Sequence, residues 1–339
     1  MFFPAWITIE CTHTLSAVLA STLLLAGFAP ARGDRSAAPR PVTVAEIDTG
    51  TRSDGFVFAE GKLAWSVAAA PAGTPDACRS VRVLDLRTQR RNRLGACDDL
   101  GRPAVIALAD DGTAYSETYG PGNDERVWRF YANSADAVRR LDAYVGHDCS
   151  TSPSCYAALF VAGSNAFVLH GGTLFRVAGP RRLERILNVP NGFFGGASWP
   201  LVALNVQDAT SETRVYRLTD GKLIHTFDGR GTTAAVSSEL LVQVDVGPPQ
   251  TNISRVYDLA SGHRLAVIRG ERVLAVAGRR VVTSARGRLV LRIDGLHPRT
   301  LASTRGRVSA ATLQDNRLLW VEELSAFPFR YRLRALDLQ

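Results

Sequence analysis

One short pattern of strand-forming residues returns along the chain, and it limits the folds that the chain can adopt. It begins as Arg214–Leu218, and a turn that ends in Gly221 and a second extended run follow it. The same order returns 41 residues later as Arg255–Leu259, with Gly262 in the turn. Alternating apolar and polar residues on either side of a glycine turn predict two antiparallel strands, because glycine readily adopts a positive φ.

The pattern occurs seven times. The copies begin at Arg82, Arg126, Thr173, Arg214, Arg255, Leu289 and Arg334, at separations of 44, 47, 41, 41, 34 and 45 residues. A second pattern opens the strand before each copy, at Gly61, Asp111, Ser164, Trp199, Ser238, Gly278 and Asn316. Strand-rich repeats of about forty residues are typical of β-propellers. The sequence therefore predicts an all-β fold of seven four-stranded blades, in which the repeated pattern forms the third strand of each blade.

The two ends of the chain are predicted to complete one blade together. The last copy of the pattern ends at Leu338, directly before the C-terminal residue, so its blade lacks an outer strand. Val42–Ile47 alternates as an isolated strand with no hairpin partner nearby. We expect it to pair with the last strand, which closes the ring and protects an open sheet edge. Almost no helix is expected after residue 40.

The third-strand pattern supports a family resemblance. An aspartate stands before the final leucine at Asp85, Asp258 and Asp337, and the turn Ser261-Gly262 follows in the fifth unit. These features resemble the third strand of WD40-type and related bacterial YVTN-like or quinoprotein-like propellers, over residues 42–339. The resemblance implies the architecture. It leaves the activity open, since most such propellers bind proteins and some are enzymes.

The N-terminal segment differs from the rest of the chain. Leu15–Phe28 is apolar and is followed by Ala29-Pro30-Ala31, which suits signal peptidase, so we expect cleavage after Ala31. The run is about 14 residues long, shorter than the roughly 20 of a membrane span. An uncleaved anchor is the alternative, since no Lys or Arg precedes the run. The predicted organisation is a signal peptide at 1–31, a linker at 32–41 and a propeller at 42–339, in a monomer that is secreted or held in the cell envelope without a stable membrane span.

Four cysteines remain after the predicted cleavage: Cys78, Cys97, Cys149 and Cys155. An even number in an exported chain indicates two disulfides. Four cysteines allow three pairings, and proximity favours Cys78 with Cys97 and Cys149 with Cys155. A zinc site is not expected, because no Cys-x-x-Cys clasp occurs and the remaining histidines have no paired spacing. We predict neither a metal nor a cofactor.

The charge of the chain is basic. Removing residues 1–31 takes away one acid and no base, which leaves 40 basic and 31 acidic residues, a net charge of +9. This excess indicates either an anionic partner or arginines spread over strand faces. We favour the second interpretation, because no basic run exceeds Arg90–Arg93. Nucleic acid is not an expected partner, since no aromatic platform alternates with the bases.

The predicted strand order divides the loops between two faces. Turns between first and second strands and between third and fourth strands form the tight-turn face. Longer second-to-third and blade-to-blade loops, which carry all four cysteines, form the loop-rich face. Binding residues concentrate on such loops, and the candidate ligand-binding residues on successive blade-to-blade loops are Asp98, Asp99, His147, Asp148, Phe193 and Phe194. Solvated loop charges and an aromatic plug are the alternative reading of these six.

No catalytic motif was found. The chain has no Gly-x-Ser-x-Gly elbow and no glycine-rich phosphate loop before a helix. We therefore predict an exported, non-catalytic scaffold that binds a protein or a cell-envelope polymer through its loop-rich face. The alternative is a hydrolase, a lyase or a quinoprotein-like enzyme, whose residues would come from several blades and converge at the channel mouth.

Overall fold

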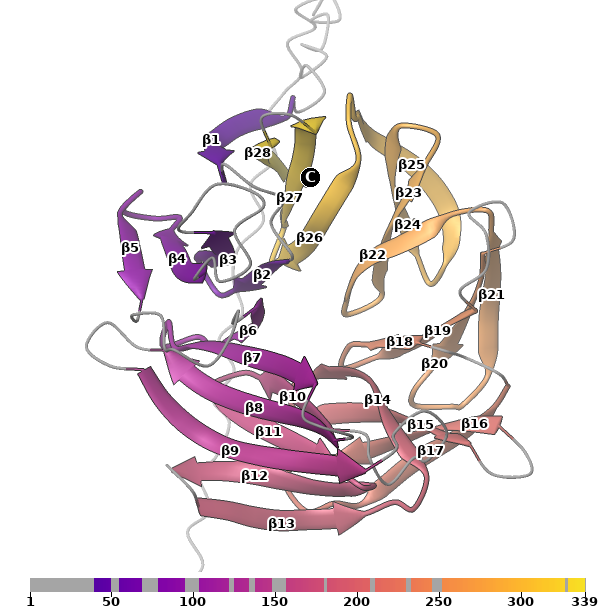
Figure 1. Ribbon diagram of the computed structural model, residues 1–339. Coiled ribbons are helices and arrows are strands. Elements are labelled where there is room, and N and C mark those ends of the chain that lie inside the picture. The colour runs from indigo at the N-terminus through magenta and orange to yellow at the C-terminus, as the bar shows by residue number, and fades with distance from the viewer. Residues whose placement is uncertain are drawn as a thin grey trace, which may run out of the picture. The chain divides into compact units, whose positions relative to one another are not determined.

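All the strands that the structure describes belong to seven four-stranded sheets, which are the predicted blades (Figure 1). The structure is a computed structural model, and it describes residues 40–49, 55–68, 79–94, 104–121, 125–133, 138–147, 157–179, 182–207, 211–229, 233–245, 252–326 and 329–338. They lie in one unit, Pro39–Gln339. Within these ranges there is no helix, and so none that is long and apolar enough to cross a membrane.

The strands follow one another along the chain from the inner to the outer edge of each blade. Blade 1 contains β2 (Phe56–Ala59), β3 (Lys62–Ala68), β4 (Arg79–Asp85) and β5 (Arg91–Leu94). Blade 2 contains β6 (Ala104–Leu108), β7 (Ala114–Pro121), β8 (Glu125–Asn133) and β9 (Val138–His147). Blade 3 contains β10 (Ala157–Ala162), β11 (Asn165–His170), β12 (Thr173–Gly179) and β13 (Arg182–Asn188). Blade 4 contains β14 (Gly192–Ser198), β15 (Leu201–Gln207), β16 (Ser211–Arg217) and β17 (Leu223–Asp228).

The last three blades keep this order, and the seventh takes its outer strand from the start of the propeller. Blade 5 contains β18 (Thr233–Val236), β19 (Leu240–Asp245), β20 (Ile253–Asp258) and β21 (Arg264–Arg269). Blade 6 contains β22 (Arg272–Ala277), β23 (Arg280–Ala285), β24 (Arg288–Ile293) and β25 (Leu296–Ser303). Blade 7 contains β26 (Val308–Gln314), β27 (Arg317–Ala326), β28 (Phe329–Asp337) and β1 (Val42–Asp48).

The repeated sequence pattern forms the third strand of every blade, as predicted. Its copies lie on β4, β8, β12, β16, β20, β24 and β28. Each of these strands pairs with the second strand on one side and with the outer strand on the other. In blades 4 and 5 the third-to-fourth turns pass through Gly221 at φ 68° and Gly262 at φ 73°, a conformation that glycine adopts without a Cβ clash.

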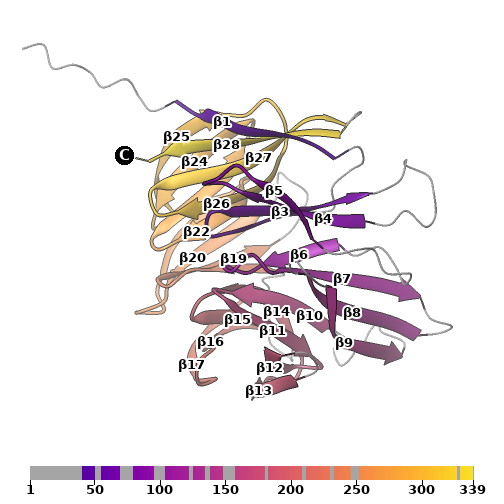
Figure 2. The ribbon, with the colours of Figure 1, turned by 90° about the vertical axis from the view of Figure 1, so that its left-hand side faces the viewer.

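The ring is closed by strands from both ends of the propeller. The inner strands of consecutive blades are in contact around the ring, and β26 of blade 7 reaches β2 of blade 1. Strand β1 pairs antiparallel with β28, from Val42 opposite Ala335 to Asp48 opposite Arg330. Both views show β1 beside β28 (Figures 1 and 2). The predicted closure is confirmed.

Apolar side chains fill the spaces between blades. Trp320 of blade 7 packs with Val282 and Leu289 of blade 6, and Trp65 of blade 1 packs with Ile47 and Tyr331 of blade 7. Trp320 and Trp65 are 0% and 3% exposed, so both tryptophans are core residues. This burial of both sheet faces explains why apolar residues fill so many strand positions.

Candidate functional site

The six predicted ligand-binding residues are described only in part. Asp98, Asp99 and Asp148 lie outside the described residues, as do all four cysteines, Cys78, Cys97, Cys149 and Cys155. His147 is the last residue of β9 and not a loop residue as predicted, and its side chain lies outside the described part. These predictions, including the disulfide pairing, remain predictions.

Phe193 and Phe194 do not lie on a loop, so that part of the prediction was wrong. They are the second and third residues of β14. The amide of Gly192 donates to the carbonyl of Val189 at 3.0 Å, which closes the turn early and lets the strand begin at Gly192. The ring of Phe194 stacks on Phe160 at 4.4 Å between centroids. Phe194 therefore packs between blades 3 and 4, where offset stacking of aromatic rings is favourable.

Polar groups on the tight-turn face join neighbouring blades to each other. Lys62 of blade 1 donates from Nζ to the carbonyl of Asp110 in blade 2 at 2.6 Å. Ser237 of blade 5 donates from Oγ to the carbonyl of Gly278 in blade 6 at 2.7 Å. Two similar bonds join Gln314 to Ala59 across blades 7 and 1, and Arg280 to Asn316 across blades 6 and 7. Much of the polar chemistry of this face is thus used to hold the ring together.

Asp258 is the strongest of these links electrostatically. Its carboxylate accepts hydrogen bonds from the backbone amide and the hydroxyl of Ser261, both at 2.8 Å. Arg279 of blade 6 donates to it at 2.9 Å and also contacts Asp294 at 2.5 Å. The bonds from Ser261 and then from Arg279 lower the pKa of Asp258 to about 2. Hydrogen bonds to a carboxylate have this effect because they favour the charged form.

Stability in acid should depend on this carboxylate. A carboxyl group with a depressed folded-state pKa stabilises the fold above about pH 4, and this contribution is lost as the pH falls towards 2. We expect Asp258→Asn to lower the melting temperature at pH 6 and to reduce its further fall between pH 4 and pH 2. Ser261→Ala should give an intermediate acid profile. Melting curves from pH 2 to pH 6 test this, and parallel profiles for wild type and Asp258→Asn would contradict it.

Six exposed arginines gather on the loop-rich face around blade 6, and we name them the arginine edge: Arg269, Arg272, Arg286, Arg288, Arg305 and Arg307. The turn between β23 and β24 and the connection from β25 to β26 are adjacent, because the amide of Thr304 donates to the carbonyl of Gly287 at 2.7 Å. Arg272 lies beside this turn, since it pairs with Ser284 near the end of β23. Arginines from separate loops are thus brought onto one side of the ring.

Arg272 and Arg307 are the pair at the inner end of this edge. Arg272 begins β22 and Arg307 directly precedes β26, the inner strands of neighbouring blades (Figure 1). Arg272 donates from Nη1 to the carbonyl of Val308 at 3.1 Å. Partial burial of the guanidinium group lowers the pKa of Arg272, because it removes water from the charged form. The positive charge of Arg307 lowers this pKa further. A guanidinium group keeps its charge in proteins, so the fold holds two like charges at the ends of contacting inner strands.

The nearest acid in the sequence is already engaged. The carboxylate of Glu271 accepts a hydrogen bond from Thr283 at 2.5 Å and forms an ion pair with Arg292 at 2.7 Å. Burial by itself raises the pKa of Glu271, but the bonds from Arg292 and Thr283 outweigh it and the pKa is lowered. Within the described residues, no ion pair joins an acid to Arg272 or Arg307. Their positive charge therefore faces solvent.

Hydrogen bonds to a buried glutamate fix the backbone of the connection between β25 and β26, which carries Arg305 and Arg307. Glu322 of β27 is 1% exposed, and its carboxylate accepts the backbone amides of Arg305 and Gly306. A side chain at Gly306 would collide with the carbonyl oxygen of Glu323, so only glycine fits this close approach. The two arginines are therefore presented by a connection whose backbone is fixed, which reduces the entropy lost when a partner binds.

The arginine edge was missed in the sequence because its members come from three separate segments. None of the segments forms a long basic run, and the basic excess was interpreted as arginine spread over strand faces. A usable signal was present: Arg272 and Arg307 directly precede or begin predicted inner strands in consecutive repeats. Among the described residues, no three His, Cys, Asp or Glu side chains are placed to hold a metal ion together.

The fold and the repeat define the class of protein. The chain is a seven-bladed β-propeller, and the solved structures that it resembles include other propellers. No protein-family model matches the sequence, and no curated protein matches it.

Three similar structures show how widely this architecture is shared. A chain of the Mitotic Checkpoint Complex is 13% identical with a TM-score of 0.56, over 93% of this chain and 98% of that chain. The Dos1 propeller is 11% identical with a TM-score of 0.54, over 88% and 96%. The propeller domain of the Trilobed protease from Pyrococcus furiosus, described as having an open velcro topology, is 11% identical with a TM-score of 0.54, over 86% and 94%. At this identity the likeness concerns the fold alone, and β1 gives the present chain a closed ring.

Proposed function

We propose that the protein is an exported binding scaffold, without chemistry of its own, that holds an acidic partner protein on the loop-rich face. The observation that carries the proposal is the pair Arg272 and Arg307: both side chains are exposed, and Arg272 donates to the carbonyl of Val308, the residue directly after Arg307. An anionic side chain placed between them would relieve their repulsion and gain charge-assisted hydrogen bonds. Export rests on the apolar segment Leu15–Phe28.

The concentration of six exposed arginines around blade 6 favours the loop-rich face. On the tight-turn face, Arg279 is engaged by Asp258 and Asp294. On the loop-rich face, the arginine edge is presented to solvent by a rigid sheet. Propellers commonly bind proteins, and arginine is enriched in the residues that dominate protein interfaces. Electrostatic complementarity of this kind speeds association and selects among partners.

Capture from cell-envelope extract tests the proposal. The full chain is immobilised, and proteins retained at low salt are compared with those retained at about 0.3 M salt, where exposed charges more than about 6 Å apart are screened. We expect the double variant Arg272→Glu and Arg307→Glu to retain roughly tenfold less of the partner. Arg264→Glu is the matched control, because Arg264 is an exposed arginine at the tight-turn end of β21 in blade 5.

The results separate the proposal from its alternatives. Equal retention by wild type and by the double variant would exclude the arginine edge as the binding surface. Retention of a protease-resistant polymer in place of a protein would overturn the protein partner and favour a cell-envelope polymer. Turnover of a substrate by the wild type, lost in the double variant, would favour the enzyme alternative.

A further inference from the structure

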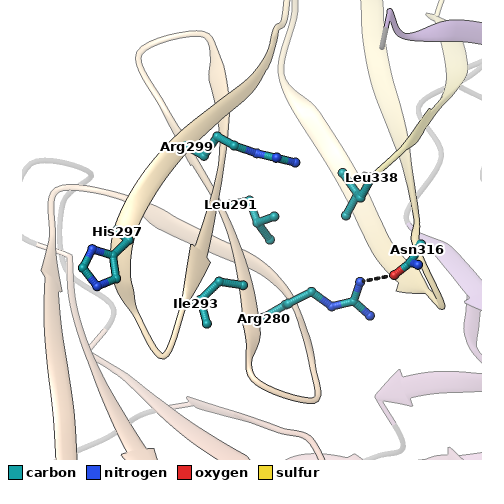
Figure 3. Close-up of a pocket in the computed structure, with 7 residues that line it drawn as sticks. All are labelled: Arg280, Leu291, Ile293, His297, Arg299, Asn316 and Leu338. Carbon is teal, nitrogen blue, oxygen red and sulfur yellow. Dashed lines mark hydrogen bonds between the residues drawn. The ribbon is translucent and has the colours of Figure 1, made fainter. Parts of the chain in front are cut away.

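A pocket lies on the tight-turn face of the ring, between blades 6 and 7 (Figure 3). It is a pocket of about 360 Å³, within the size range of small-ligand sites. The residues that line it come from the ends of β23, β24 and β25, from the turn before β27 and from the end of the chain. They are Arg280, Leu291, Ile293, His297, Arg299, Asn316 and Leu338.

The lining combines aliphatic surface with two fixed positive charges. Both guanidinium groups extend from blade 6 towards blade 7, with Leu291 and Leu338 between them in this view, while His297 lies at the outer margin (Figure 3). Leu291 and Leu338 are buried, at 7% and 8% exposure. None of the lining residues that the structure describes carries a carboxylate. The pocket therefore offers an apolar wall together with positive charge that no lining acid neutralises.

Of the two arginines, Arg280 is fixed by a hydrogen bond to the next blade, whereas the guanidinium group of Arg299 is available to a ligand. Arg280 donates from Nη1 to Oδ1 of Asn316 at 3.1 Å, which fixes its guanidinium across the gap between the blades. Arg299 has no ion pair with an acid among the described residues. A guanidinium carries five donors in a planar fork that matches a carboxylate. Arg299 can therefore bind a carboxylate without giving up a link that holds the ring.

A local irregularity of β25 opens the pocket. Leu291 pairs with Arg299, but Ile293 pairs with Leu296, so one residue of β24 faces two residues of β25. Two residues opposite one define a β-bulge, which bends the strand and changes the direction of its side chains. Bulges are over-represented next to active sites. His297, one of the two residues that face Arg292, has a φ of 46°. A left-handed conformation at a residue other than glycine is uncommon and costs free energy.

We propose that this pocket binds a small aliphatic carboxylate, with the carboxylate held by Arg299 and Arg280 and the alkyl part against Leu291, Ile293 and Leu338. This chemistry is supplied either by a free fatty acid or by the C-terminal leucine of a peptide. The site is independent of the arginine edge, because it lies on the tight-turn face. The two proposals can therefore fail separately.

Calorimetric titration of the full chain tests the site with defined probes. Octanoate should bind saturably, while octanol lacks the charge and inorganic phosphate lacks the alkyl part, so both should bind at least tenfold more weakly. Arg299→Gln should weaken octanoate binding at least tenfold. Arg264→Gln is the matched control, since Arg264 is an exposed arginine on the same face in blade 5 and does not line the pocket, and it should leave the affinity unchanged.

The sources are distinguished by a short peptide that ends in leucine, with a free or an amidated C-terminus. Binding of the free-acid peptide in preference to octanoate would support the site and identify a peptide end as its ligand. Equal binding of octanol and octanoate would overturn the proposal and leave an apolar hollow. An affinity for octanoate that is unchanged in Arg299→Gln would overturn it as well. Melting curves of each variant show whether the fold is kept.

Discussion

Deletion of Val42–Asp48 should lower the melting temperature of the protein by more than roughly 10 °C. The deleted strand is the outer strand of blade 7, and its loss exposes the hydrogen-bonding edge of β28. It also removes Ile47, which is 1% exposed and packs with Trp65 of blade 1 and Tyr331 of blade 7. The deletion therefore opens a sheet edge and takes a side chain out of the joint between the last blade and the first.

A point substitution separates the two contributions of this strand. Ile47→Ala keeps the backbone pairing and should cost about 2–5 kcal/mol, as for other fully buried aliphatic side chains. Val42→Ala, in the same strand, should have little effect, because Val42 is 53% exposed. Scanning calorimetry of the three variants checks the prediction. Equal melting temperatures for the deletion variant and wild type would show that the ring is closed in another way.

Trp320→Ala should destabilise the fold by about 3–5 kcal/mol. Trp320 is fully buried between blades 6 and 7, among Leu289, Leu318 and Leu336. The guanidinium carbon of Arg334 lies 5.5 Å from the centre of its ring, so the substitution also removes a cation–π contact. A cavity at this joint cannot collapse easily, because two sheets hold its walls apart.

Trp320→Phe is the informative comparison. Among the residues that the structure describes, the indole Nε1 of Trp320 has no hydrogen-bond partner, so phenylalanine removes volume without breaking a described hydrogen bond. We expect it to cost clearly less than alanine. Urea denaturation gives both free energies of unfolding, and an equal loss for the two variants would mean that the aromatic ring does not support the joint.

The architecture could be predicted because each blade uses the same local signals. Alternating residues in the third strand, a glycine such as Gly221 or Gly262 in the turn, and a regular spacing all lie within a few residues of one another in the sequence. The closure by β1 could be predicted as well. The last repeat lacked an outer strand and Val42–Ile47 lacked a partner, so pairing the two satisfied both.

The sites were less accessible because they form between blades. The pocket depends on a one-residue bulge in β25 and on Arg280 reaching Asn316 of the next blade, and neither follows from a pattern within one repeat. Phe193 and Phe194 were assigned to a loop because a blade-to-blade loop was predicted from Val189 to Gly195. The turn is complete by Gly192, and packing against Phe160 makes Phe194 part of a strand.

Amide hydrogen exchange of the full chain, with and without the captured partner, tests the central proposal most directly. A partner on the arginine edge should slow exchange in the segments that contain Arg269–Arg272, Arg286–Arg288 and Thr304–Arg307, and should leave the turn before Arg264 unchanged. The double variant at Arg272 and Arg307 should lose this protection and keep its fold. Protection confined to the tight-turn face, or unchanged in the double variant, would contradict the proposal that the loop-rich face binds an acidic partner.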